Sequence, residues 1–363
     1  MQEILYFLKR NFFSEGLLMK KIGIAIIGYG YMGEWHYQKI KNNQYVDVIC
    51  VFDTSVERRN MAKFQGLLAY DNVDNMFCNE NVDAVLIATP NSFHEYYIRK
   101  AFFYNKHVIC EKPVTIDSRV LFDLINIAKE KKIVFTGHFN RRWDNDFQKV
   151  LNICNSGKVG KINYIESRVL GEYGSMYGWR SEPAYGGGIF LDWAPHLIDQ
   201  ALILNQGQKV ISVFATIKSI HTLKVDDYFR LMITFDNQTT FYIECGIFCL
   251  LKPFRWLVYG SEGTLRGNDE ISVAVLDKKN TKIIRNENDS CSRLMQPLGK
   301  DAIKDYIIEG TYPCHDGFYT NFYETINGIS EIFINSQDMY RVSKIMDVAL
   351  LSAQKSINCS VII

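Results

Sequence analysis

The chain has 363 residues, of which 47% are hydrophobic and 22% charged, and its formal net charge is +1. These proportions are those of an ordinary folded globular protein. The near-neutral charge gives no reason to expect a nucleic acid or an anionic membrane as a partner. Single hydrophobic cores stop growing at roughly 250–300 residues, so a chain of this length is expected to form two domains.

The sequence carries no sign of a membrane anchor or of a disulfide framework. No apolar run approaches the roughly 20 residues that a membrane helix needs. The nine cysteines are scattered and include no CxxC pair, so we expect reduced thiols in a cytoplasmic protein and no metal site. The alternative is a zinc site or a disulfide framework.

Residues 1–18 are predicted to be an extension that precedes the first domain. The stretch Leu5–Phe13 is amphipathic, but charged residues interrupt it and no small-residue cleavage site follows, which argues against a signal peptide. The extension is either a lengthened reading of the start codon, since Met19 would be a natural start, or a surface helix used in assembly.

The first strong pattern is a strand, a glycine turn and a helix. Ile22–Ile27 is a short apolar run typical of a buried parallel strand. It leads into Gly28, Gly30 and Gly33, and a helix is predicted from Met32 to Lys41. A side chain is excluded at each glycine for a different reason: Gly28 allows a tight turn, Gly30 lets a pyrophosphate approach the backbone closely, and Gly33 lets the helix pack closely on the strand. The turn is completed by further predicted cofactor contacts, Tyr29, Tyr31 and Met32.

An acidic residue closes the next strand. The apolar run Val46–Phe52 ends at Asp53, twenty positions after Gly33, where a carboxylate would accept hydrogen bonds from a ribose. Together with the helix N-terminus, which favours phosphate, this pattern predicts a dinucleotide site. The alternative is a purely structural tight turn.

Alternating helices and strands continue up to about Asn140. Strands are predicted at Ala84–Ala88, His107–Cys110 and Ile133–Gly137. Helices are predicted at Ser55–Gln65, with Thr54 or Ser55 as cap, Glu95–Asn105 and Ser118–Lys131. Such a series forms a parallel sheet whose strand ends meet at one edge. We therefore expect cofactor contacts from the residues at these ends: Thr89, Pro90, Asn91, Glu111 and Lys112.

After Asn140, apolar and polar residues alternate with a period of two, which is typical of antiparallel strands. We therefore predict an α/β Rossmann domain over residues 19–140 and an α+β domain over residues 141–363. Helices are predicted at Asp144–Ser156, Phe318–Ile326 and Gln337–Lys355. Strands are predicted at Ile162–Leu170, Val210–Ile220, Tyr228–Phe235, Thr239–Phe248 and Phe254–Tyr259.

One segment of the second domain carries candidate catalytic residues. A glycine run, 186–188, leads into a helix with Pro195 expected in its first turn. Asp192 and His196 are four apart and would share one face or one end of that helix. His196 can serve as a general base that Asp192 orients, and Lys112 can supply positive charge at a reacting oxygen. The alternatives are a capping Asp192, a core His196, and a Lys112 paired with Glu111.

These motifs resemble the Gfo/Idh/MocA oxidoreductases, which include glucose–fructose oxidoreductase and inositol dehydrogenases, from about Lys20 to the end. The resemblance is carried by the glycine turn, Ala88–Asn91 with His94, Glu111-Lys112-Pro113, the block from Gly186 to His196, and Tyr259–Leu265. It implies a second domain with an open, largely antiparallel sheet that often mediates homodimers, homotetramers or higher homo-oligomers. It also implies that Lys112, Asp192 and His196 match the catalytic residues.

The segment from Gly186 to Leu204 looks most like the scyllo-inositol dehydrogenase branch, which can use NADP. Asp53 would repel a 2′-phosphate, although Arg58 and Arg59 could soften this effect, so NAD is the expected cofactor and NADP the less favoured one.

Other candidate contacts are less specific. His94 could touch the nicotinamide side or cap the following helix. Aromatic rings suit the apolar faces of a sugar, and Arg and Asn suit its hydroxyls. Candidate substrate contacts, beside the three catalytic residues, are Asn140, Arg141, Tyr173, Trp179 and Arg180. The loop that contains Tyr173, Trp179 and Arg180 could equally be an oligomer contact.

The sequence therefore predicts an NAD-dependent enzyme that reversibly converts a secondary hydroxyl of a sugar, a glycoside (for instance at C3) or a cyclitol to a ketone. One alternative is a redox-neutral, NAD-retaining glycosidase or a sugar-to-keto-sugar oxidoreductase. Another is a nucleotide-binding regulator without catalytic activity.

Overall fold

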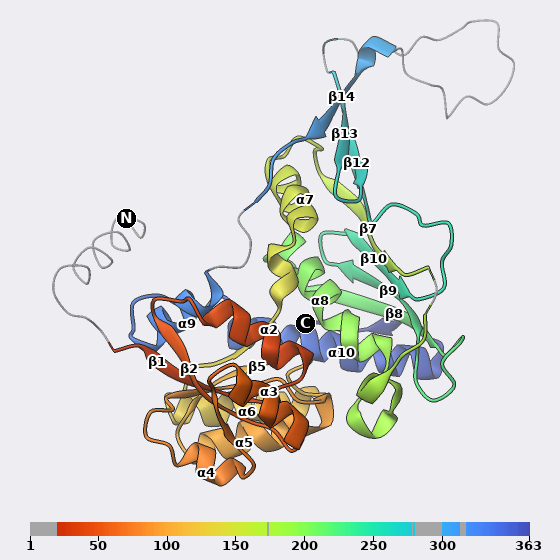
Figure 1. Cartoon of the computed structure of the whole chain (residues 1–363). Helices are drawn as coiled ribbons and strands as arrows, with labels where there is room; N and C mark the ends of the chain where they lie inside the picture. The colour runs from red at the N-terminus through yellow and green to blue at the C-terminus, as the bar shows by residue number, and fades with distance from the viewer. Residues whose placement is uncertain (1–19, 173, 278, 280–299, 313–316) are drawn as a thin grey trace, which may run out of the picture. The chain divides into compact units, whose positions relative to one another are not determined.

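The structure is a computed structural model that describes residues 20–172, 174–277, 279, 300–312 and 317–363 (Figure 1). The predicted extension, 1–18, lies outside this range. The chain forms two compact units, and it passes from the first to the second between Asn140 and Arg141. The first unit also contains Met176–Pro195 and a later segment that ends at Asp347, and the second unit contains the rest.

The first unit is built on a six-stranded sheet in which every neighbouring pair is parallel. The strand order is β3-β2-β1-β4-β5-β6. The bounds are β1 Ile22–Ile27, β2 Val46–Phe52, β3 Leu68–Tyr70, β4 Ala84–Ile87, β5 His107–Cys110 and β6 Phe135–Gly137. All six residues of β1 are buried, as expected for a central strand covered on both faces. The predicted Rossmann sheet is confirmed.

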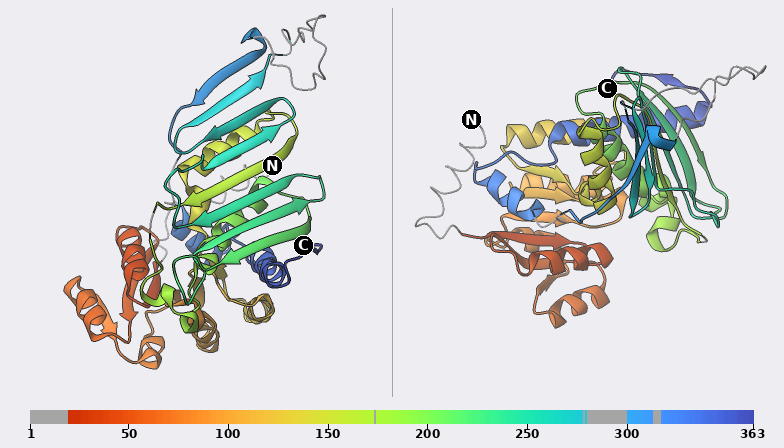
Figure 2. Two further views of the ribbon diagram at one scale, coloured as in Figure 1. Left: turned by 90° about the vertical axis from the view of Figure 1, so that its right-hand side faces the viewer. Right: turned by 90° about the horizontal axis from the view of Figure 1, so that it is seen from above.

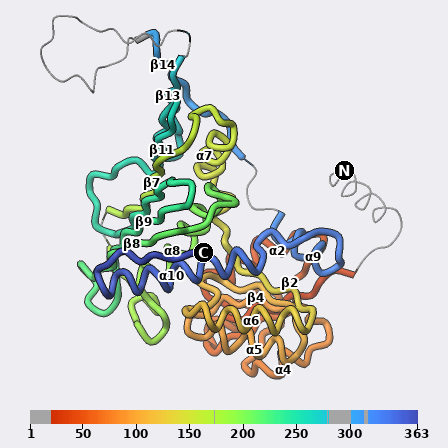
Figure 3. Tube along the Cα trace, turned by 180° about the vertical axis from the view of Figure 1, so that it is seen from behind, coloured from red at the N-terminus to blue at the C-terminus, as the bar shows by residue number. Residues whose placement is uncertain are grey.

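Helices connect these strands. Right-handed crossovers place α2 and α3 on one face and α5 and α6 on the other, and α5 packs beside α6 (Figure 3). Ser55 is the N-cap of α3, because its side chain accepts a hydrogen bond from the backbone of Arg58. The bounds are α2 Tyr31–Ile40, α3 Val56–Phe64, α4 Val73–Phe77, α5 His94–Phe103, α6 Ser118–Glu130 and α9 Phe318–Ile326.

The order of strands creates a reversal between β1 and β4, which lie side by side. From β1 the chain proceeds outward to β2 and β3, and then returns to β4 on the other side. The loops that follow β1 and β4 therefore diverge at the carboxyl edge, where open α/β sheets bind ligands.

The second unit contains a nine-stranded sheet of order β14-β13-β12-β11-β7-β10-β9-β8-β15. Its neighbours are antiparallel except for the parallel pair β7 and β10, so the mostly antiparallel sheet is confirmed. The bounds are β7 Ile162–Leu170, β8 Val210–Lys218, β9 Tyr228–Phe235, β10 Thr240–Gly246, β11 Trp256–Gly260, β12 Gly263–Gly267, β13 Ile271–Leu276, β14 Ile303–Ile308 and β15 Cys359–Ser360.

One face of this sheet is covered by helices and the other is open (Figure 2). Leu231 and Ile233 of β9 are buried, whereas Arg230 and Met232, which alternate with them along the strand, are exposed. The remaining α-helices of the described residues are α7 Asn145–Asn155, α8 Ile189–Leu204 and α10 Ser336–Lys355. None of the helices within the described residues is both long and apolar enough to span a membrane.

The position of Pro195 differs from the prediction. Helix α8 begins at Ile189, so Pro195 lies inside the helix and not in its first turn. Proline has no N–H to donate to the carbonyl of Leu191, four residues earlier, which is a local cost. Ile189 and Phe190 are buried, and this packing extends the helix beyond the start that local signals favour.

Candidate functional site

The glycine turn after β1 has the geometry that a pyrophosphate site needs. Gly28 has a φ of +90°, which favours glycine. A Cβ on Gly33 would lie 2.1 Å from the carbonyl oxygen of Gly28, so helix α2 packs too closely on the turn for any side chain. Gly30 is the N-cap of α2 and provides no side-chain cap, and a Cβ built there meets nothing within 4 Å. The first-turn N–H groups of α2 thus adjoin open space that fits a phosphate.

Asp53 is tied to this turn by backbone hydrogen bonds. Its Oδ2 accepts from the N–H of Tyr29 at 2.7 Å, and its Oδ1 accepts from the N–H of Ser55 at 2.8 Å. Arg59 does not pair with the carboxylate; its Nη1 donates to the carbonyl oxygens of Asp53 and Thr54 at 2.8 and 2.9 Å. The carboxylate is therefore fixed beside the glycine turn, where a ribose partner belongs.

The loop after β4 contributes Thr89, Pro90 and Asn91. Asn91 begins the 3₁₀ turn η1 (Asn91–Phe93) and donates through Nδ2 to the carbonyl oxygen of Gly186 at 2.7 Å, which ties this loop to the predicted glycine run. Thr89 Oγ1 is buried without a hydrogen-bond partner among the described residues. A buried hydroxyl at this edge fits a polar group of a bound nucleotide.

His94 is fully buried at the start of α5. Its Nδ1 lies 2.8 Å from the carbonyl oxygen of Pro113, and its Nε2 lies 3.0 Å from that of Thr89. Burial is the larger effect and lowers the pKa of His94, while the two carbonyls oppose this change. The ring thus joins the loops that follow β4 and β5.

Lys112 and Asp192 meet although they are eighty positions apart. Lys112 Nζ donates to Asp192 Oδ1 and to the Asp192 carbonyl oxygen, each at 2.7 Å. Arg180 Nε contacts Asp192 Oδ2 at 3.2 Å, and its guanidinium lies 4.5 Å from the Trp179 ring centre. Burial raises the pKa of Asp192, but the charges of Lys112 and Arg180 outweigh it and hold that pKa below its ordinary value. The carboxylate is therefore an anion shared by two cations.

His196 follows Asp192 by one turn in α8 and is also buried. The turn after it is firmly held within the second unit. Arg142 donates two hydrogen bonds to the carboxylate of Asp199, from Nε to Oδ2 at 2.7 Å and from Nη2 to Oδ1 at 2.6 Å. Gln200 Nε2 donates to the carbonyl oxygen of Arg141 at 2.9 Å, and these bonds fix the axial rotation of the helix that carries His196.

Several residues in these networks carry no signal in the sequence. Arg142, Asp199 and a buried set around Glu111, comprising His36, His138 and Tyr319, become visible only in the structure. Their sequence separations are long and follow no motif spacing. The chain has 7 histidines, and this number does not indicate that His36 and His138 share one partner.

The remaining predicted contacts are placed as follows. Asn140 opens the 3₁₀ turn η2 (Asn140–Trp143), and Arg141 forms an ion pair of 3.0 Å with Asp144. Trp179 and Arg180 lie in the turn η3 (Gly178–Ser181), which precedes a second turn, η4 (Pro183–Tyr185). Tyr173 lies outside the described residues.

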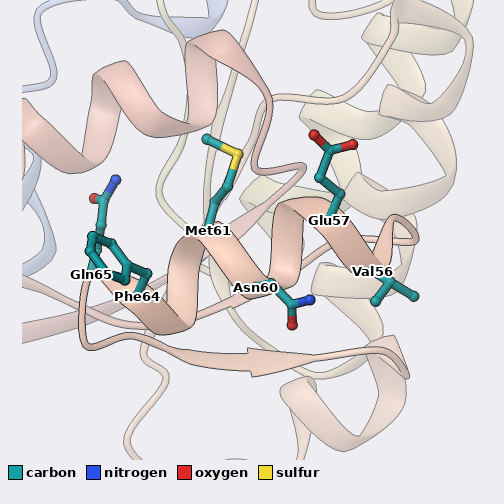
Figure 4. Close-up of a pocket in the computed structure, with 6 residues that line it drawn as sticks. All are labelled: Val56, Glu57, Asn60, Met61, Phe64 and Gln65. Carbon is teal, nitrogen blue, oxygen red and sulfur yellow. The ribbon is translucent and has the colours of Figure 1, made fainter.

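A hollow also lies along helix α3, and one of its lining residues, Gln65, accepts a hydrogen bond from the Tyr29 hydroxyl at 3.0 Å. Figure 4 shows that its lining comes from α3 and the residue that ends it: Val56, Glu57, Asn60, Met61, Phe64 and Gln65. None of these is a predicted catalytic or cofactor residue, and the single helix provides no converging polar groups. The candidate site therefore centres on the glycine turn and Lys112.

The doubly wound sheet, the glycine turn and Asp53 define a dinucleotide-binding Rossmann protein. Two family models match the chain: "Oxidoreductase family, NAD-binding Rossmann fold" over residues 22–138, and "GFO/IDH/MocA C-terminal domain" over residues 147–266. The chain belongs to the GFO/IDH/MocA family of NAD-binding oxidoreductases.

Individual relatives agree with this assignment. An NAD-binding protein from Listeria innocua has a structure with a TM-score of 0.85 and 33% identity, covering 94% of this chain and 97% of that one. Myo-inositol 2-dehydrogenase of Thermotoga maritima is 31% identical over 53% of this chain and 57% of its own. The scyllo-inositol 2-dehydrogenase (NADP(+)) of Bacillus subtilis is 22% identical over 92% of this chain and 94% of its own.

Two alanine variants separate the folding role of the glycine turn from its binding role. Gly33→Ala places a Cβ against a backbone oxygen, so we expect a loss of about 1–3 kcal/mol in unfolding free energy. Gly30→Ala should lose less stability than Gly33→Ala, up to about 1 kcal/mol for alanine at a helix N-cap, and it should weaken NAD binding, because its Cβ enters the open space. Thermal unfolding and NAD titration measure the two effects; equal NAD affinity of Gly30→Ala and wild type would contradict the pyrophosphate site.

Proposed function

We propose that this protein is an NAD-dependent dehydrogenase that reversibly oxidises one secondary hydroxyl of a sugar, glycoside or cyclitol to a ketone. The observation that carries the proposal is the contact of Lys112 with Asp192. It sets a cation and an anion, both largely buried, at the end of β5, beside the loops of the dinucleotide site. The inositol dehydrogenases among the relatives support the substrate class.

Each catalytic residue has a distinct task in this proposal. NAD, held by the glycine turn and Asp53, would supply the hydride acceptor for the carbinol carbon. Lys112 donates a hydrogen bond to the substrate oxygen and stabilises its developing negative charge. His196 accepts the hydroxyl proton as general base, and Asp192 stabilises the resulting positive charge of His196 while holding Lys112.

The substrate contacts are proposed on chemical grounds. Trp179 offers an apolar ring, and Arg180, stacked on it, offers donors for hydroxyl groups. Asn140 and Arg141 are further candidates. Oxidation at C3 of a glucoside is one version of the proposal, since a 3-keto group acidifies the neighbouring C–H.

The catalytic assignment is tested with purified protein and a panel of free sugars, glycosides and inositols, each with NAD and NADP. We expect NADH formation with at least one ring polyol. His196→Ala and Lys112→Ala should each lower kcat by roughly 100-fold or more. NAD should still bind to His196→Ala, because His196 is not among the predicted cofactor contacts.

A suitable control is His221→Ala, since His221 is an exposed histidine of the second unit; it should keep full activity. Unchanged activity of His196→Ala would remove the assignment of the base. Substrate turnover without net NADH would instead favour an enzyme that recycles its cofactor in place.

We further propose that NAD is preferred over NADP. Asp53 is an anion fixed beside the ribose position, and Arg59 uses its donors on backbone oxygens. Replacing Asp53 by Ser should shift the preference toward NADP by about tenfold, which corresponds to ~1.4 kcal/mol. The comparison of kcat/KM for both cofactors measures this, with the exposed Asp47→Ser as control. A preference equal to that of the wild type would contradict the ribose role.

We also propose that the open face of the nine-stranded sheet forms a homo-oligomer contact. This face carries aromatic and arginine side chains, which are enriched at interfaces. Arg168 lies 5.5 Å from the Tyr242 ring centre, and the Tyr164 and Tyr259 rings stack at 5.8 Å.

Light scattering after size exclusion should therefore give a dimer or a larger assembly. Met232→Asp adds a charge to this face and should reduce the assembly to monomers, because the carboxylate would be buried without a partner. Phe64→Asp, on the exposed side of α3, should leave the mass unchanged. A monomeric wild type would refute the proposed contact.

A further inference from the structure

Glu111, the residue before Lys112, is buried and joined by hydrogen bonds to a network that includes, among the described residues, His36, His138 and Tyr319. Its Oε1 lies 2.9 Å from His36 Nε2 and 2.8 Å from His138 Nδ1. His36 Nδ1 in turn lies 2.6 Å from Tyr319 Oη. The four side chains come from α2, the end of β5, the residue after β6, and α9, and all are buried.

The protons of this network can be assigned from chemistry. An ionised carboxylate only accepts hydrogen bonds, so His36 Nε2 and His138 Nδ1 both carry protons. The Tyr319 hydroxyl then donates to His36 Nδ1. Burial raises the pKa of Glu111, but its bonds to His138 and His36 outweigh this and hold the pKa well below its ordinary value. Glu111 is therefore a buried anion.

A metal ion would be the other explanation for this group. The three ligand atoms of His36, Glu111 and His138 lie within 4.8 Å of one another. A closed structural zinc site needs four protein ligands, whereas Tyr319 sits on the far nitrogen of His36. Because both N···Oε1 distances are ordinary hydrogen-bond lengths, hydrogen bonds among the described residues account for Glu111 Oε1 without a metal.

The network acts on the backbone that carries Lys112. Glu111 Oε2 accepts from the N–H of Lys112 at 3.3 Å, and His94 contacts the carbonyl oxygen of Pro113 on the other side. Hydrogen bonds thus fix the residues on both sides of Lys112, Glu111 and Pro113, while Lys112 Nζ donates to Asp192. We propose that Glu111, fixed by His36 and His138, is a positioning residue that aims Lys112 at Asp192. This inference rests on the proposed catalytic role of Lys112.

A labelling experiment tests the positioning without any assay of activity. Acetic anhydride is added to the protein, and peptide mass spectrometry gives the acylation rate of each lysine. Glu111→Gln removes the charge and sets an amide donor against the Lys112 N–H, so we expect Lys112 to acylate several-fold faster than in the wild type. Lys100, which pairs with Asp74 at 2.8 Å, is the internal reference and should not change.

A matched pair at His138 provides the second test. His138→Asn keeps an N–H donor near the Nδ1 position, whereas His138→Leu removes it. We expect the Leu variant to lower kcat by up to roughly 100-fold and to speed Lys112 acylation, with little change in KM or NAD affinity. The Asn variant should restore most of both properties, which a purely space-filling role of His138 would not predict.

Three outcomes would overturn the inference. The first is a folded Glu111→Gln protein in which Lys112 acylates at the wild-type rate. The second is stoichiometric zinc or iron in the purified protein that is lost in His138→Leu, since the cluster would then be a metal site. The third is unfolding of both Glu111→Gln and His138→Leu, which would assign the cluster to stability alone. Absence of dehydrogenase activity in the wild type would refute the proposed function but leave the labelling result interpretable.

Discussion

The contact between Lys112 and Asp192 links the end of β5 to the first turn of α8, and much of the first unit is arranged to support it. Burying two charges costs free energy unless each finds a close partner. Here Lys112 Nζ donates to Oδ1 and to the carbonyl oxygen of Asp192, and Arg180 Nε donates to Asp192 Oδ2. Removing either cation would leave a largely buried anion undercompensated, which explains why the pair is embedded in further bonds.

The same physical constraint recurs around the site. Glu111 is buried and satisfied by two imidazoles, Asp53 by two backbone N–H groups, and Asp199 by a two-pronged arginine. Each carboxylate thus accepts at least one hydrogen bond from another part of the chain, so that its charge fixes the relative position of two segments. Polar groups that are satisfied in this way specify one arrangement more sharply than apolar contacts of similar size.

The cofactor side relies on space rather than on charge. Gly33 brings α2 close to the turn, and Gly30 leaves room at the helix N-terminus. An anion beside exposed N–H groups gains from the helix dipole and from direct hydrogen bonds. The architecture therefore separates two requirements: an open, donor-rich turn for the nucleotide and a filled, charge-compensated interior behind Lys112.

The sequence alone determined the features whose physics is local. Three glycines between a buried strand and a helix, an acid at the end of the next strand, and period-two alternation in the second half each depend on neighbours within a few residues, and they predicted both sheets. The partners of Lys112, the histidines on Glu111 and the start of α8 at Ile189 were decided by tertiary structure. Such partners are brought together only when separate elements pack, because a hydrogen bond across eighty residues has no spacing rule, and burial of Ile189 and Phe190 overrides the local signals for a helix start.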